Sequence, residues 1–209
     1  MPATAVTTTA TTTVVPETTV TAATTEAPAD HRLPSYGVLE TSRRPVAAGE
    51  TTCSPAPGAG KTAEVKAAEP GAPILTIAVP NGFTLGPGQG DVAAKLSGPA
   101  GLTGAVLITP TTLDAADAFQ KYADDRTAGY DINSVSVLPA ELCEYSGQKL
   151  MGMLAAKPGH GINYVDRIAH VWTNTGDFLV ALQLQGPTGA PGLDEAASVM
   201  LADFGVRIT

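Results

Sequence analysis

The residues whose spacing first suggests chemistry are Gly58–Thr62, GAGKT, which match the end of a phosphate-binding loop. A complete loop has the pattern G-x-x-x-x-G-K-[ST], follows a buried strand and opens a helix. Here Pro55 stands where the first glycine should be, and the preceding AAGETTC is not the core of a strand. The following AEVKAAEPG meets Pro70 within about two helical turns. We therefore predict that GAGKT is a loop and that the chain binds no nucleotide.

Side chains that could act as a base, nucleophile or metal ligand are scattered along the chain. His31 lies in a polar N-terminal region and His160 in a Gly-flanked hairpin, whereas His170 lies in an apolar strand and is typical of a packed side chain. Ser146 is no nucleophile elbow, because Glu144 stands where the G-x-S-x-G motif has its first glycine. Without a convergent set of such groups, we expect no catalytic residues, no metal, no cofactor and no enzymatic activity.

The two cysteines, Cys53 and Cys143, are ninety positions apart and form no C-x-x-C motif, which argues against redox-active and zinc sites. The residues before Cys53, Gly-Glu-Thr-Thr, lack the character of a lipoprotein cleavage site. In an exported chain two lone cysteines are best paired, so we predict a Cys53–Cys143 disulfide. The alternative is two unpaired thiols in a cytosolic protein.

Charge and hydropathy exclude several classes of partner. The net charge is −8, and no Lys/Arg cluster exists beyond Arg43–Arg44. Nucleic acids and anionic membrane surfaces both require clustered cations, so neither is an expected partner. No run of eighteen apolar residues and no signal-peptide pattern is present. We expect an extracytoplasmic protein, anchored or secreted through an N-terminal segment that is absent from this chain.

The composition divides the chain into three parts. Residues 1–29 hold twelve threonines, two acidic groups and no Lys or Arg, so they cannot bury enough apolar surface to order themselves. We predict a disordered Thr-rich stalk there, either glycosylated or an unmodified flexible linker. Residues 30–70 predict an irregular arm, because turn and breaker residues surround a few apolar side chains. Residues 71–209 predict a single domain.

Within that domain the hydrophobic pattern predicts strands, a helix, a meander and a second helix. The helices are expected from Leu113-Asp114 to near Gly129 and from Leu193 to Phe204, each with acidic residues in its first turn. Ile74–Leu85, broken by Pro-Asn-Gly, predicts two short strands or a strand with a bulged corner. The other predicted strands are Val92–Leu96, Gly104–Thr109, Ser134–Leu138 continuing to Tyr145, Gln148–Ala156, Ile162–Thr173 and Phe178–Gln185. This order predicts an α+β fold, an antiparallel sheet of about six to seven strands flanked by two main helices.

Several stretches of this domain carry a resemblance to a known family. They are ILTIAVPNGF, the GAVLITP strand leading into a Leu-Asp-Ala helix, the strand meander, and a closing helix with VMLADFGV. From about Pro73 to its end the chain resembles the mycobacterial LpqN-type lipoprotein family, which has a PsbP-like fold. Phe83 stands where that family usually has tryptophan. The resemblance implies an antiparallel sheet flanked by helices, an envelope location and a non-enzymatic role in lipid or glycolipid handling.

Two functions are consistent with these observations. The first is binding of an apolar or glycolipid envelope ligand, in a pocket lined by flexible or amphipathic side chains. The side chains proposed for it are Met151, Met153, Tyr164, Trp172 and Phe178. For any one of them the alternative is an ordinary place in the core. The second function is that of a protein–protein adaptor for a membrane transporter or wall-assembly enzyme, with no small ligand.

Overall fold

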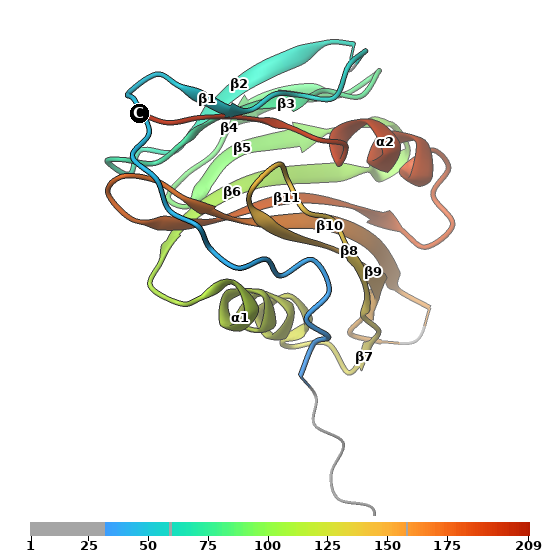
Figure 1. Ribbon diagram of the computed structural model, residues 1–209. Coiled ribbons are helices and arrows are strands. Elements are labelled where there is room, and N and C mark those ends of the chain that lie inside the picture. Colours follow the sequence, from blue (N-terminus) through green and yellow to red (C-terminus); the bar gives the residue numbers. More distant parts are fainter. Residues whose placement is uncertain (1–31, 59, 158) are drawn as a thin grey trace, which may run out of the picture. The chain divides into compact units, whose positions relative to one another are not determined.

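The computed structural model describes residues 32–58, 60–157 and 159–209 (Figure 1). Residues 32–209 form one compact unit. The expected stalk, residues 1–29, and His31 lie outside the described residues. In the described part, twelve strands form two sheets, accompanied by two α-helices and the short 3-10 helix Pro99–Gly101. No helix among these residues has the length and apolar character needed to cross a membrane.

The larger sheet has eight antiparallel strands, in the order β4-β5-β6-β11-β10-β9-β7, with β8 also paired to β9. These strands are β4 (Thr84–Pro87), β5 (Val92–Ser97), β6 (Thr103–Thr111), β7 (Ile132–Asn133), β8 (Ser136–Pro139), β9 (Ser146–Ala155), β10 (Gly161–Trp172) and β11 (Asp177–Pro187). The meander β9-β10-β11 was predicted, because Gly and Asn residues supply the turns between its strands.

The smaller sheet has four strands in the order β1-β12-β3-β2. They are β1 (Thr51–Cys53), β2 (Thr62–Lys66), β3 (Ile74–Ala78) and β12 (Gly205–Arg207). β12 joins the last residues of the chain to two strands near its start, β1 on one side and β3 on the other.

Two expectations are corrected here. The strand count is twelve rather than six to seven, and residues 30–70 contain β1 and β2 instead of being wholly irregular. Strands of two to five residues carry too little alternation to be recognised, and they form because distant segments pair with them. For the same reason α2 (Leu193–Met200) ends before Phe204, and the chain turns into β12.

The larger sheet buries both of its faces. On one face the main core lies against the smaller sheet and α2, with β11 contributing Phe178, Val180, Leu182 and Leu184 as the alternation predicted. On the other face a second core forms under α1 (Ala115–Thr127), around side chains such as Phe119. Figure 1 shows α1 on one side of the larger sheet and the smaller sheet with α2 on the other.

α1 begins where the sequence predicted. The Asp114 side chain caps the helix by accepting a hydrogen bond from the backbone N–H of Asp117, at 2.9 Å. Ala115, Phe119 and Tyr122 then fall on the face that packs on the sheet, at spacings of three and four residues.

Residues 32–46, which we call the strap, run beside α1 and across the ends of the central strands. Leu39 N donates to Ser146 Oγ at 2.9 Å, and Gln148 Nε2 donates to Tyr36 O at 2.8 Å. Near the end of the strap, Asn174 Nδ2 donates to Val46 O at 2.6 Å. The strap therefore completes the layer that contains α1.

The predicted disulfide is present and links Cys53 to Cys143 across a separation of 90 residues. It joins β1 of the smaller sheet to the turn that leads into β9 of the larger one. Next to it, the hydroxyl groups of Thr52 and Tyr145 lie 2.6 Å apart. The disulfide thus ties the two sheets together at one edge.

Candidate ligand-binding groove

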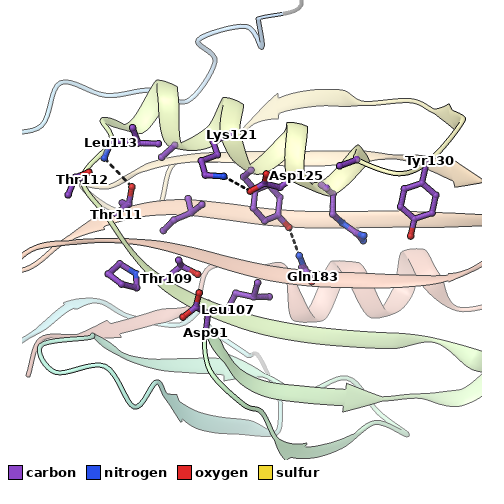
Figure 2. Close-up of a pocket in the computed structure, with 16 residues that line it drawn as sticks. Asp91, Leu107, Thr109, Thr111, Thr112, Leu113, Lys121, Asp125, Tyr130 and Gln183 are labelled. Carbon is purple, nitrogen blue, oxygen red and sulfur yellow. Dashed lines mark hydrogen bonds and ion pairs between the residues drawn. The ribbon is translucent and has the colours of Figure 1, made fainter.

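A groove of about 790 Å³ opens between α1 and the outer face of β6 and β11 (Figure 2). It exists because α1 packs over β9 and β10, so that β6, which lies beyond β11 in the sheet, stays partly uncovered. The volume lies within the range of sites that bind drug-sized ligands. The groove is therefore the candidate functional site.

The floor of the groove is apolar. Leu107 of β6 and Leu179 of β11 point to the same side of the sheet, as the register of the two antiparallel strands requires. Ala118 of α1 and Leu113, just before the helix, continue this surface towards the start of α1. These side chains offer a contiguous surface for an alkyl chain or another apolar group.

The margins of the groove are polar. Thr109 and Thr111 of β6 supply hydroxyl groups. On α1, Lys121 Nζ pairs with Asp125 Oδ2 at 2.8 Å, and both side chains are mostly exposed. Figure 2 shows Asp91 at the margin opposite α1. An apolar floor between hydroxyl and carboxylate groups suits an amphipathic ligand.

A chain of hydrogen bonds leads from the groove into the core beneath α1. Gln183 Nε2 donates to the Tyr122 hydroxyl at 2.9 Å, and that hydroxyl donates to Asp166 Oδ2 at 2.8 Å. Arg126 Nε donates to the same carboxylate oxygen at 2.8 Å and Nη2 donates to Gln185 Oε1. Gln183, Tyr122 and Arg126 line the groove, whereas Asp166 lies beneath it.

Burial is the largest single influence on the pKa values in this hydrogen-bonded network. It raises the pKa of Asp166, against the opposing effect of the Arg126 guanidinium. It also raises the pKa of Tyr122 well above its ordinary value, with the Asp166 charge acting in the same direction. For Arg126 burial is the largest single influence and lowers the pKa, but the charge of Asp166, its hydrogen bond and the nearby tyrosines together outweigh burial, so the net shift is upwards. Beneath these residues, the Arg126 guanidinium lies 4.8 Å from the centre of the Tyr164 ring.

None of the five ligand-binding residues proposed from the sequence lines this groove. Tyr164 packs in the core under α1, whereas Trp172 and Phe178 lie in the main core between the sheets. Met151 and Met153 are partly buried on β9. The structure thus distributes these side chains over both faces of the sheet instead of gathering them around one cavity.

The residues that do form the groove left a signal in the sequence. Ala118, Lys121, Tyr122 and Asp125 follow one another at intervals of three, one and three, so they share one side of α1. This stripe mixes small, charged and aromatic groups, which is unusual for a purely solvated surface. Its pairing with β6, however, depends on the order of strands in the sheet.

The other residues whose types suggested chemistry in the sequence have structural roles. Gly58–Thr62 leads into strand β2 and not into a helix, so no helix N-terminus is available for a phosphate there. His170 is buried, with Nε2 3.0 Å from Leu113 O. Among the described residues no three His, Cys, Asp or Glu side chains are grouped as metal ligands.

Comparison with known proteins identifies the architecture. No family model and no curated protein matches the sequence. Among solved structures, this α+β architecture is shared with LpqN of Mycobacterium tuberculosis, a protein involved in cell envelope biogenesis. That match has a TM-score of 0.53 and 18% identity, and covers 70% of this chain and 91% of LpqN. PsbP (CyanoP) from Synechocystis sp. PCC 6803 matches with a TM-score of 0.42 and 17% identity, over 70% and 94% of the chains.

The chain therefore has the LpqN-type fold, as its sequence resemblance predicted. At this level of identity the likeness establishes the fold alone.

Proposed function

We propose that this chain is a non-enzymatic protein of the extracytoplasmic cell envelope that binds an amphipathic lipid or glycolipid. The groove beside α1 carries this proposal, because an apolar floor and polar margins meet there in a volume of about 790 Å³. The alkyl part of the ligand lies on Leu107 and Leu179, and its headgroup faces the hydroxyl and carboxylate groups.

The charges around the groove favour an uncharged, hydroxyl-bearing headgroup. Lys121 is engaged by Asp125, and Arg126 is engaged by Asp166. Asp91 stands on the opposite margin. An anionic headgroup would meet these carboxylates without an unengaged cation among the groove residues, whereas sugar hydroxyls can both donate to and accept from them.

The envelope location is supported by two observations. LpqN, which shares the fold, is involved in cell envelope biogenesis. The Cys53–Cys143 disulfide is typical of proteins that fold in oxidising compartments outside the cytosol.

A non-enzymatic role is supported by the chemistry of the groove. The described residues that line it include no histidine, serine or cysteine, and its acidic residue on α1 is paired with Lys121. Among these lining residues, no base–nucleophile pair is aimed at the place where a ligand would lie.

A second candidate function is that of a protein–protein adaptor for a membrane transporter or wall-assembly enzyme. It is favoured by exposed apolar side chains on the short edge strands, where Leu138 of β8 is 49% exposed and Ile132 of β7 is 42% exposed. Exposed apolar groups at a sheet edge suit contact with another protein.

Filling the groove tests the ligand-binding proposal. Dodecyl maltoside below its micelle concentration and dodecanoate are titrated while the melting temperature is recorded. We expect dodecyl maltoside to raise the melting temperature of the parent protein and to have no effect on Thr109→Trp, whose indole occupies the groove. Thr103→Trp is the matched control, because Thr103 lies on the same face of β6 but outside the groove, and it should respond like the parent. No shift at saturating concentrations of either probe would instead favour the adaptor.

A further inference from the structure

We propose that Gln183 determines which headgroups the groove accepts, and that Asp166, which does not touch the ligand, sets the orientation of Gln183. The inference rests on the proposed function and names the chemistry of its ligand: a group that donates a hydrogen bond to Gln183 Oε1. Asp166 is a positioning residue that acts through Tyr122.

The first step is at Asp166. Arg126 Nε and the Tyr122 hydroxyl both lie 2.8 Å from Asp166 Oδ2. The guanidinium provides the counter-ion for an ionised carboxylate, which accepts hydrogen bonds and donates none. The single proton of the Tyr122 hydroxyl must therefore point at Asp166.

The second step is at Tyr122. Because its proton is committed to Asp166, its oxygen can only accept from Gln183, 2.9 Å away. The atom of Gln183 facing Tyr122 must then be the NH₂ group and not the carbonyl oxygen. An amide side chain has two orientations that are nearly identical in shape, and this relay selects one of them. Tyr122 is buried, so water does not compete for the contact.

The third step is at the groove. Nε2 of Gln183 is held by Tyr122. The amide oxygen of Gln183 receives no hydrogen bond from the residues that the structure describes, and because it is not buried it can be reached from the groove. Gln183 is half-buried and lines the groove. The groove therefore presents a fixed acceptor at this point, and a hydroxyl or amide N–H of the ligand satisfies it. A headgroup that offers only acceptors leaves Oε1 unpaired, which disfavours its binding.

Two probes with equal alkyl chains test this preference by isothermal titration below their micelle concentrations. Dodecyl maltoside offers many donors, whereas dodecyl oligoethylene glycol capped with a methyl ether offers acceptors alone. We expect the parent protein to bind the maltoside about three- to tenfold more tightly, the loss expected for one neutral hydrogen bond. In Gln183→Leu and in Tyr122→Phe the ratio should fall towards one, and in the control Thr103→Val it should not change. A ratio near one in the parent, or an unchanged ratio in both groove variants, overturns the proposal.

Asp166→Leu tests the positioning role without touching the groove. The apolar side chain accepts no hydrogen bond, so the tyrosine proton is released towards Gln183. The Gln183 amide then turns its NH₂ group to the groove, so the preference for the maltoside should disappear or reverse. Retention of the parent's preference in the folded variant overturns the relay.

An experiment on the unliganded protein separates the relay from ligand binding. In ¹H–¹⁵N spectra of the full chain, the side-chain NH₂ signals of Gln183 should differ from those of solvated glutamines and move towards them in Tyr122→Phe. Signals that do not move in that variant overturn the relay. If neither probe binds while these signals behave as expected, the proposed function fails and the orientation of Gln183 stands.

Discussion

Arg126 Nε lies 2.8 Å from Asp166 Oδ2, and the Asp166 side chain is completely buried. This ion pair connects α1, which forms one wall of the groove, to β10 in the middle of the larger sheet. The two residues are 40 positions apart in the sequence. One side of α1 faces the groove, and another side faces the strap. The position of α1, and with it the width of the groove, depends on this contact.

We expect Arg126→Ala to destabilise the protein by about 3–5 kcal/mol, because it leaves a buried carboxylate without its cation. The free energy of unfolding from urea titration measures the effect. Lys121→Ala is the control on the same helix, since the Lys121 and Asp125 side chains are 64% and 67% exposed. Its pair should contribute no more than about 0.5 kcal/mol. Equal stabilities for the two variants would contradict a structural role for the Arg126–Asp166 pair.

Removal of the disulfide should be the most destabilising change at the edge of the sheets. On the chain-entropy model, a closed loop spanning 90 residues contributes about 4–5 kcal/mol. We expect the double variant Cys53→Ala, Cys143→Ala to lose roughly this amount in chemical denaturation. A reducing agent should destabilise the parent similarly and leave the variant unchanged. Two titratable thiols in the denatured, non-reduced protein would show that the bond does not form in solution.

Tyr164 makes stability sensitive to alkaline pH. Burial, together with the charge of Asp166, raises the pKa of Tyr164 from 10.0 to about 12. Because the pKa in the folded state exceeds that in the unfolded state, the stabilising contribution is complete below pH 10. It is lost as the pH rises from 10 to about 12.

The variant Tyr164→Phe isolates this titration. It removes the hydroxyl group that donates to Ser134 O at 3.0 Å but keeps the ring beneath Arg126. At neutral pH it should be less stable than the parent by about 1 kcal/mol, for one lost hydrogen bond. The difference should shrink between pH 10 and 12, as measured by urea unfolding. A constant difference across that range would mean that Tyr164 does not titrate with the shifted pKa.

The strap depends on a glycine at position 37. Gly37 has φ +68°, and a Cβ atom there would lie far inside contact distance of the backbone oxygen of Gly147. Gly37→Ala should therefore break the hydrogen bond from Gly147 N to Gly37 O and release the strap from β9. Hydrogen exchange at Leu39, whose N–H donates to Ser146, reports this release.

Gly49→Ala is the matched control for the strap. Gly49 also has a positive φ, +83°, but nothing lies within 4 Å of its Cβ position. It should carry only the strain of that conformation, about 1 kcal/mol, and leave exchange at Leu39 unchanged. Similar exchange in the two variants would show that the close approach at Gly147 does not hold the strap.

Local patterns in the sequence were sufficient for the central elements. The alternation of Phe178, Val180, Leu182 and Leu184 predicted a strand with one buried face, and Asp114 marked the start of α1. Helix caps, turns and side-chain periodicity are set by residues close together in the chain, so they can be recognised from the sequence alone. The pairing of the two cysteines could also be inferred, because no other cysteine competes.

The groove and the smaller sheet were decided by tertiary structure. β1 is a strand because it pairs with β12, and β2 is a strand because it pairs with β3. No local pattern in the sequence predicts these pairings. The aromatic and methionine side chains chosen from the sequence are divided between the two cores, because distant elements packing on each part of the sheet decide which side chains meet. The groove depends on α1 covering β9 and β10 while β6 lies beyond it. That arrangement follows from the order of strands, and long-range pairing alone determines it.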